Sequence, residues 1–383
     1  MPAYNAAEFI DDAVESILAQ SFKSWELIII DDGSSDGTYE IAKKWTGKDS
    51  RIRALTQPNA GASAARNTGL EAAQAQWVAF VDSDDWIHRD FLKKLMRPLD
   101  RKPLDAVFCI AADVASDGSL GKRWIPVHGD SLFPVFATDC PIAVHSGIFR
   151  RSLIQEIGSW DPDLSTCEDC ELCMRLSRTT DCVENVMKEL AFIRLRKGSL
   201  SRSMPARLAR DGVIVIERAG RADPRVPAPS PRWAKGLVTR DRDDRVAQHL
   251  IWSAALDIAS GGDGKAILAS DPDRFSSQIE PEDLAAAIWD AISHTTGEMA
   301  DDWSTYMPAV SGLVAWLDEV NPTQDLERRT FKALELMIFQ YAYLDEPVVF
   351  GGTYWITIDV EEPIAPVSVP NGLAQLAVVV FEG

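Results

Sequence analysis

The stretch Trp77-Val78-Ala79-Phe80-Val81-Asp82-Ser83-Asp84-Asp85 places three carboxylates directly after a short apolar run. Such a run, bounded by polar residues, predicts a buried strand with the acids at its carboxyl end. Open α/β sheets bind ligands at that end of their strands. Asp82 and Asp84 point the same way on an extended segment, so both can face one divalent cation, Mg²⁺ or Mn²⁺. Taken alone, the cluster is also compatible with a solvated turn or a helix cap.

The composition restricts the class of protein. The chain has 383 residues, 46% of them hydrophobic, which is enough for two domains and a sizeable core. Its formal net charge of −19 argues against a nucleic-acid partner, because binding a phosphate backbone needs clustered Lys and Arg. No apolar stretch approaches the roughly 20 residues that span a bilayer, and the N-terminus does not resemble a signal peptide. We therefore expect a cytoplasmic protein, and the six cysteines fit a reducing compartment.

Strand and helix patterns alternate in the first part of the chain. Residues 6–21 carry an apolar stripe at i, i+3, i+4 and i+7, typical of an amphipathic helix, and residues 25–30 follow as a buried strand. A helical pattern over 38–45, a weaker strand over 52–55 and an Ala-rich helix over 62–75 continue the series. This alternation predicts an α/β fold with a parallel sheet and helices on both faces.

The remaining patterns predict three parts. A sheet of this type needs a strand before its first helix, yet the chain begins at Met1-Pro2-Ala3-Tyr4-Asn5, so either the true start lies upstream or the first strand is a stub. We expect an α/β domain over 1–203, a Pro/Arg-rich linker over 204–236 and a C-terminal region over 237–383. In the last region the residue patterns predict helices over 246–259, 281–293, 303–317 and 326–344, then strands over 348–360 and 373–381.

Motifs across the first 200 residues, taken in order, resemble those of the family 2 glycosyltransferases. They are Pro2-Ala3-Tyr4-Asn5, Ser16-Ile17-Leu18-Ala19-Gln20-Ser21-Phe22, Asp31-Asp32-Gly33-Ser34-Ser35-Asp36-Gly37-Thr38, Ala65-Arg66-Asn67, Asp82-Ser83-Asp84-Asp85, Phe149-Arg150-Arg151, Gly158-Ser159-Trp160-Asp161, Glu168-Asp169-Cys170-Glu171-Leu172 and Gly198-Ser199-Leu200-Ser201. The resemblance implies the GT-A fold, a Rossmann-like mixed sheet flanked by helices. It also implies inverting, metal-dependent transfer of a sugar from a nucleotide donor.

The resemblance further implies roles for single residues. Asp169 matches the catalytic base, and Asp84, helped by Asp82, would hold the divalent metal and the diphosphate. The residues expected at the nucleotide are Pro2, Tyr4, Asp32, Arg66 and Asp82. Each has a plainer interpretation: Asp32 can begin a turn, Arg66 can lie on a helix surface, and Glu168-Asp169 can be a charged first helical turn.

The chemistry of glycosyl transfer agrees with these roles. An oxocarbenium-like centre needs a stabilised leaving group on one face and a base on the other. A metal at Asp82 and Asp84 would neutralise the departing nucleoside diphosphate. Asp169 would take the proton of the acceptor hydroxyl, a contribution on the order of 10² to 10⁴ in rate.

Two features depart from the family pattern. Many relatives carry a His shortly before the Gly-Ser-Leu-Ser segment, where this chain has Arg196, which can clamp phosphate oxygens but cannot bind a metal. Processive members carry a Gln-x-x-Arg-Trp motif, and here Pro229 stands in place of the Gln before Arg232-Trp233. We therefore expect a single-transfer enzyme.

The cysteines form a rival constellation. Cys167, Cys170 and Cys173 make a C-x-x-C-x-x-C run that is compatible with zinc or an iron–sulfur cluster. If one helix holds all three, Cys167 and Cys173 diverge by roughly 120° and stand about 9 Å apart along its axis. Such thiols converge on one ion only if the helix breaks, so we do not expect a metal there.

The leading hypothesis is therefore an inverting glycosyltransferase that uses a UDP-sugar and Mg²⁺ or Mn²⁺ in polysaccharide or glycan synthesis. Its partners would be the nucleotide-sugar donor and a glycan or lipid-linked acceptor. A cytoplasmic location, including the inner face of a membrane, fits such an acceptor. The alternatives are a catalytically weak nucleotide-sugar-binding or scaffold protein, and a metal protein built on the cysteines.

Overall fold

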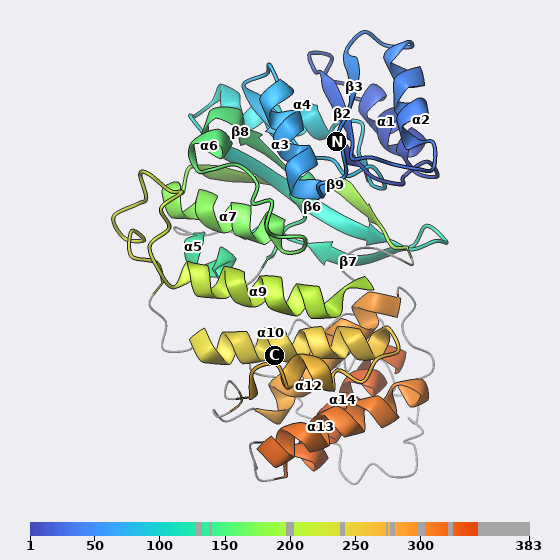
Figure 1. Cartoon of the computed structure of the whole chain (residues 1–383), viewed down its shortest axis with the longest axis vertical. Helices are drawn as coiled ribbons and strands as arrows, with labels where there is room; N and C mark the ends of the chain where they lie inside the picture. The colour runs from blue at the N-terminus through green and yellow to red at the C-terminus, as the bar shows by residue number, and fades with distance from the viewer. Residues whose placement is uncertain are drawn as a thin grey trace, which may run out of the picture.

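The computed structural model (Figure 1) describes most of the chain up to residue 343. The described residues are 1–127, 132–137, 140–196, 203–237, 242–272, 275, 280–296, 303–320 and 325–343. The predicted strands over 348–360 and 373–381 and the motif at 198–201 lie outside them.

An α/β region forms the upper part of the molecule in Figure 1. Its strands are β1 (Pro2–Ala3), β2 (Leu27–Asp31), β3 (Ile52–Thr56), β4 (Trp77–Ala79), β5 (Trp86–Ile87), β6 (Ala106–Val114), β7 (Leu120–Trp124), β8 (Gly147–Arg150) and β9 (Val183–Arg194). Its helices are α1 (Ile10–Leu18), α2 (Thr38–Thr46), α3 (Ala62–Ala72), α4 (Phe91–Met96), α5 (Phe133–Phe136), α6 (Arg151–Glu156) and α7 (Glu168–Thr179), with 3₁₀ turns at Arg97–Asp100 and Val144–Ser146. The predicted α/β architecture is confirmed.

The strands form two hydrogen-bonded groups. In the first, β1, β2 and β3 are parallel, and the two-residue β1 pairs Pro2 with Ile30 and Ala3 with Asp31. The second has the order β4-β8-β6-β9-β5, with β7 on β6. There β6 and β9 are parallel, whereas β8 runs antiparallel to both β4 and β6, so the sheet is mixed.

Hydrophobic packing explains why the first sheet forms. All five residues of β2 are buried, as expected for a parallel strand that is covered on both faces. The apolar stripe of α1, formed by Ile10, Val14 and Ile17, packs in the same core cluster as Ile29 of β2. Burying an aliphatic side chain of this kind contributes about 1.5–3 kcal/mol. This packing holds the carboxyl ends of the strands in place.

Helices make up the lower part of the molecule (Figure 1). They are α9 (Pro205–Ala219), α10 (Arg242–Ala259), α11 (Lys265–Leu268), α12 (Pro281–Thr296), α13 (Met307–Val320) and α14 (Leu326–Tyr343), with a 3₁₀ turn at Trp303–Thr305. The four helices expected from periodicity correspond to α10, α12, the 3₁₀ turn with α13, and α14, so the mainly helical character is confirmed. Within the described residues, no helix is long and apolar enough to cross a membrane.

Helix α9 lies inside the stretch that the sequence indicated as a linker. Leu208 and Ala209 belong to the hydrophobic core of the C-terminal helices, whereas Val215 and Ala219 belong to the core that contains α6 and α7. The buried carboxylate of Asp211 also accepts hydrogen bonds from backbone N–H groups in the loop that precedes α7. This part of the predicted linker is therefore a helix shared by two hydrophobic cores.

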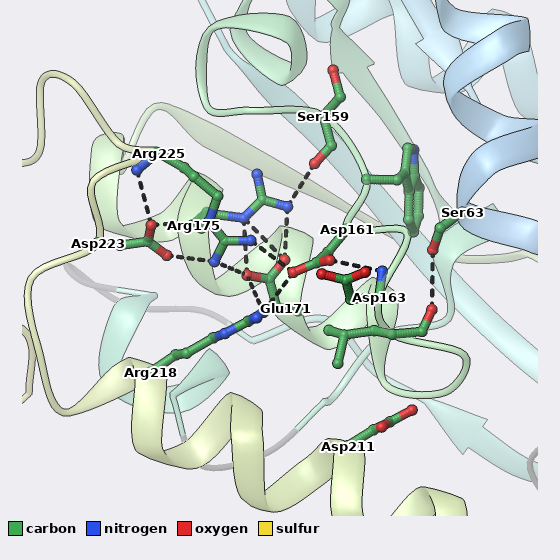
Figure 2. Close-up of polar contacts among 12 residues, drawn as sticks. Ser63, Ser159, Asp161, Asp163, Glu171, Arg175, Asp211, Arg218, Asp223 and Arg225 are labelled. Carbon is green, nitrogen blue, oxygen red and sulfur yellow. Dashed lines mark hydrogen bonds and ion pairs between the residues drawn. The ribbon is translucent and has the colours of Figure 1, made fainter.

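A buried ionic network connects α7 to α9 and to the segment that follows it (Figure 2). Glu171 and Arg175 of α7, both with fully buried side chains, pair at 2.7 Å. Arg225 also pairs with Glu171, and its Nη1 lies 3.0 Å from Oδ2 of Asp161. Arg218 of α9 binds the same Asp161 oxygen at 2.6 Å. The network fixes the position of α7 from the side of α9.

Substituting Glu171→Gln is expected to lower the free energy of unfolding by about 3–5 kcal/mol, because it leaves the fully buried charge of Arg175 without its carboxylate partner. Denaturant unfolding followed by tryptophan fluorescence measures the change. The control is Asp325→Asn, which removes the exposed pair with Arg328 and should change stability by less than about 1 kcal/mol. Equal effects from the two substitutions would contradict the role assigned to the network.

Candidate active site

The carboxylates that follow β4 lie beside a buried arginine. Asp82 comes after the strand, as the sequence predicted, and its Oδ1 accepts a hydrogen bond of 2.8 Å from Nη2 of Arg66 on α3. Burial alone would raise the pKa of Asp82, but the positive charge of Arg66 outweighs burial and holds that pKa below its usual range. Asp82 is therefore ionised at neutral pH.

Arg66 joins two parts of the site. Its Nη1 donates to Oε1 of Glu168 at 2.7 Å, while Nη2 donates to Asp82. The guanidinium carbon lies 4.5 Å from the ring centroid of Trp160, and Asn67 holds the Trp160 backbone with two hydrogen bonds of 2.9 Å. Burial disfavours the charge, but the two carboxylates raise the pKa of Arg66 above its usual range. Arg66 is thus a buried cation, not a helix-surface residue.

Asp169 lies in the first turn of α7, next to the Glu168 that Arg66 binds. Its Oδ1 accepts the backbone N–H of Cys170 at 2.8 Å. Burial, reinforced by the negative charge of Glu168, raises the pKa of Asp169 to about 6. A carboxylate with this pKa is mostly ionised at pH 7 and is a stronger base than an ordinary aspartate.

Asp84 and Arg196 form an ion pair. Nη2 of Arg196 lies 2.7 Å from Oδ2 of Asp84, and Nε donates to the same oxygen at 2.8 Å. The neighbouring Arg194 donates its backbone N–H to Asp85 and its Nε to the backbone carbonyl of Asp84. The end of β9 therefore lies against the acidic motif, and Arg196 faces the acid expected to hold the metal.

His145 adds a side chain that the sequence did not single out. Together with Asp82 and Asp85 it forms a group whose ligand atoms all lie within 4.8 Å of one another. Its Nδ1 is 3.5 Å from Oδ2 of Asp85, and neither ring nitrogen has a hydrogen-bond partner among the described residues. Burial lowers the pKa of His145, so the imidazole is neutral, as metal binding requires.

Asp85 shares this environment. Burial, together with the charges of Asp84 and Asp82, raises the pKa of Asp85 well above its usual range. A cation placed among Asp82, Asp85 and His145 would offset the repulsion between the carboxylates. It would also give the imidazole of His145 a binding partner. The oxygen and nitrogen donors present therefore fit a divalent metal.

The residues expected at the base of the nucleotide lie in the first sheet and its loops. Asp32 is buried, and its carboxylate accepts hydrogen bonds from Gln57 and from the backbone N–H groups of Ala60 and Gly61. Tyr4 is 55% exposed, and Pro2 belongs to β1. In this structure Asp32 holds the loop that precedes α3. Helix α3 in turn carries Arg66.

Comparison with known proteins supports the family resemblance of the N-terminal part. The model for the family described as Glycosyl transferase family 2 matches residues 1–158. The glycosyltransferase GlyA of Streptococcus pneumoniae serotype 4 is 29% identical over 218 residues, which are 53% of this chain and 31% of GlyA. YibD of Escherichia coli K12, an uncharacterized glycosyltransferase, is 41% identical over 151 residues, 39% of this chain and 43% of YibD.

The match therefore spans less than half the length of these two relatives. Among solved structures, S. aureus TarS 1-349 in complex with UDP is 17% identical with a TM-score of 0.47, and the alignment covers 94% of this chain and 96% of that chain. The predicted family resemblance is confirmed for the N-terminal part, where residues 1–158 of this chain match the glycosyl transferase family 2 model.

Proposed function

We propose that this chain transfers a sugar, with inversion, from a nucleotide-sugar donor to an acceptor hydroxyl in polysaccharide or glycan synthesis. The family match of residues 1–158 supports the reaction class. The observation that carries the proposal is the buried Arg66, because its guanidinium contacts both Asp82 and Glu168, the residue before the proposed base Asp169. A UDP-sugar is the proposed donor, with a glycan or lipid-linked acceptor.

In this proposal Asp169 is the general base. It accepts the proton of the acceptor hydroxyl as that oxygen attacks the anomeric carbon. A pKa of about 6 suits the task, because the group is ionised at neutral pH yet binds a proton more readily than an ordinary aspartate. The Cys170 backbone N–H and the Glu168–Arg66 pair hold the first turn of α7, and therefore the base, in position.

The proposed metal ligands are Asp82 and Asp84, to which we add Asp85 and His145. A bound cation supplies charge neutralisation for the departing diphosphate. The pair between Asp84 and Arg196 places a second positive group beside this acid, suited to contact a diphosphate oxygen. A nitrogen ligand favours Mn²⁺ over Mg²⁺, because Mg²⁺ takes oxygen ligands almost exclusively.

The remaining proposed donor contacts are Pro2, Tyr4 and Asp32, which would lie against the nucleotide base. The exposed Tyr4 ring is available for such a contact. Asp32 already holds the loop over 57–61, so its contribution includes shaping that loop as well as any contact with the base.

Substituting Asp169→Asn should lower kcat by about 10² to 10⁴, because the amide cannot accept the acceptor proton. In the wild type, kcat should fall about tenfold per pH unit below about 6, because Asp169 becomes protonated as the pH drops through its raised pKa. Nucleotide release from UDP-sugars across pH 4.5 to 8 measures both, and calorimetric UDP binding checks that the variant still binds donor. A flat profile down to pH 4.5 would remove Asp169 from the role of base.

Substituting His145→Ala should weaken Mn²⁺ binding by at least about 10- to 100-fold, because the cation loses its nitrogen ligand. It should affect Mg²⁺ binding less. Titration calorimetry of the full chain with each metal provides the measurement. The matched control is His249→Ala, which removes a partly buried imidazole bonded to Leu208 in the helical region. If both variants bind Mn²⁺ like the wild type, His145 is not a ligand.

A second candidate is a nucleotide-sugar-binding protein with little or no transferase activity. The observation that favours it is the direct pair between Asp84 and Arg196, which occupies one oxygen of an expected metal ligand. The two candidates differ in turnover: tight UDP binding without transfer across a broad acceptor panel selects the binding protein. Substituting Arg196→Ala separates them further. If Arg196 obstructs the metal site, its removal raises the metal affinity. If Arg196 contacts the diphosphate, its removal lowers the affinity for the donor.

A further inference from the structure

Three cysteine thiols and the Asp169 carboxylate gather at the start of α7. Cys140 precedes the 3₁₀ turn at Val144–Ser146, far from α7 in the sequence, and yet the ligand atoms of Cys140, Cys170 and Asp169 all lie within 4.8 Å of one another. The thiols of Cys140 and Cys167 both interact with the Cys170 thiol. The cluster thus joins the loop that leads into β8 with the first turn of α7.

The backbone at Cys167 changes the argument against a metal at these cysteines. Helix α7 begins at Glu168, and Cys167 precedes it in the left-handed region with φ of 58°. Non-glycine residues rarely adopt this conformation, and they concentrate at functional sites. Because Cys167 lies outside the regular helix, the helical spacing that would separate it from its neighbours does not apply to it. That spacing still holds for Cys173, which is buried in the core that α7 shares with α6.

We propose that Cys140, Cys167, Cys170 and Asp169 form a zinc site. Zn²⁺ takes four ligands in a tetrahedron and prefers thiolates, with Zn–S distances of about 2.3 Å. Ligand atoms in such a tetrahedron are about 3.8 Å apart. Those of Cys140, Cys170 and Asp169 already lie within 4.8 Å of one another, so small side-chain movements would bring them to that separation. Each thiol releases its proton to solvent as it binds the cation.

The chemistry of the thiols argues against a reactive cysteine. The neighbouring thiols of Cys140 and Cys167, together with burial, raise the pKa of Cys170 well above its usual range. A thiol with a raised pKa is a poor nucleophile and is slow to oxidise. Mn²⁺ and Mg²⁺ prefer oxygen ligands, whereas thiolates select zinc, so the cluster does not compete for the cation proposed at Asp82.

Zinc at this site would act on transfer through Asp169. A carboxylate bound to the cation is no longer free to accept the acceptor proton, so zinc would inhibit the enzyme without displacing Mn²⁺ or the donor. This regulatory part rests on the proposed function. The binding of zinc itself does not, and it can be measured without any substrate.

Cobalt spectroscopy on the full chain tests the site. The reduced protein, freed of metal by a chelator, is titrated with Co²⁺ and then with Zn²⁺. We expect a thiolate-to-cobalt charge-transfer band in the near ultraviolet that Zn²⁺ abolishes. Cobalt bound at Asp82, Asp85 and His145 gives no such band, because that group contains no sulfur. Absence of the band in the wild type, or a Cys140–Cys170 disulfide in the protein as purified, overturns the proposal.

Two variants connect the band to these residues. Cys140→Ser should weaken zinc binding by more than about 10- to 100-fold, whereas Cys182→Ser, which removes an exposed thiol outside the cluster, should bind zinc like the wild type. If Cys140→Ser fails to fold, Cys167→Ala replaces it. Equal zinc affinity in the wild type and in the folded cluster variant overturns the proposal. Full transfer by the zinc-loaded wild type overturns the regulatory part alone.

Discussion

The buried guanidinium of Arg66 is the interaction on which the arrangement of the site depends. One arginine can donate to two carboxylates at once because its planar fork carries separate nitrogens, which a lysine ammonium could not reproduce. Here the fork contacts Asp82 after β4 and Glu168 at the start of α7, and Trp160 packs on its face. Removing either carboxylate would leave a buried charge incompletely compensated, a change that typically costs several kcal/mol. The two halves of the site are therefore held together electrostatically through α3.

Much of the first half could be predicted because its patterns are local. Apolar runs and helical stripes located β2, β3, α1, α2 and α3, and the acids after residue 81 lie at the end of a strand as expected. The antiparallel pairing of β8 could not be foreseen, because the motif Phe149-Arg150-Arg151 indicates a family and not a strand partner. His145 and Cys140 were also missed, since each reaches its cluster only through tertiary folding.

The stretch after residue 203 shows how composition can mislead. Its many arginines and prolines are typical of a linker, yet Pro205 occupies the first turn of α9, where proline is well tolerated. Several of the arginines form ion pairs with buried carboxylates. Arg218 and Arg225 both pair with Asp161, and Arg225 also pairs with Glu171. Arginines in such a stretch indicate solvent exposure only if the fold offers no buried carboxylate with which they can pair.

The placement of α9 between two cores has a consequence for recombining this chain with its relatives. One face of the helix covers the α/β region and the other face covers the C-terminal helices. Ending the α/β region before residue 205 would remove Val215 and Ala219 from its core. It would also remove the arginines that pair around Glu171. A cut after 219 would instead leave Leu208 and Ala209 uncovered. An exchange of the C-terminal region must therefore also redesign the face of α9 that packs against it.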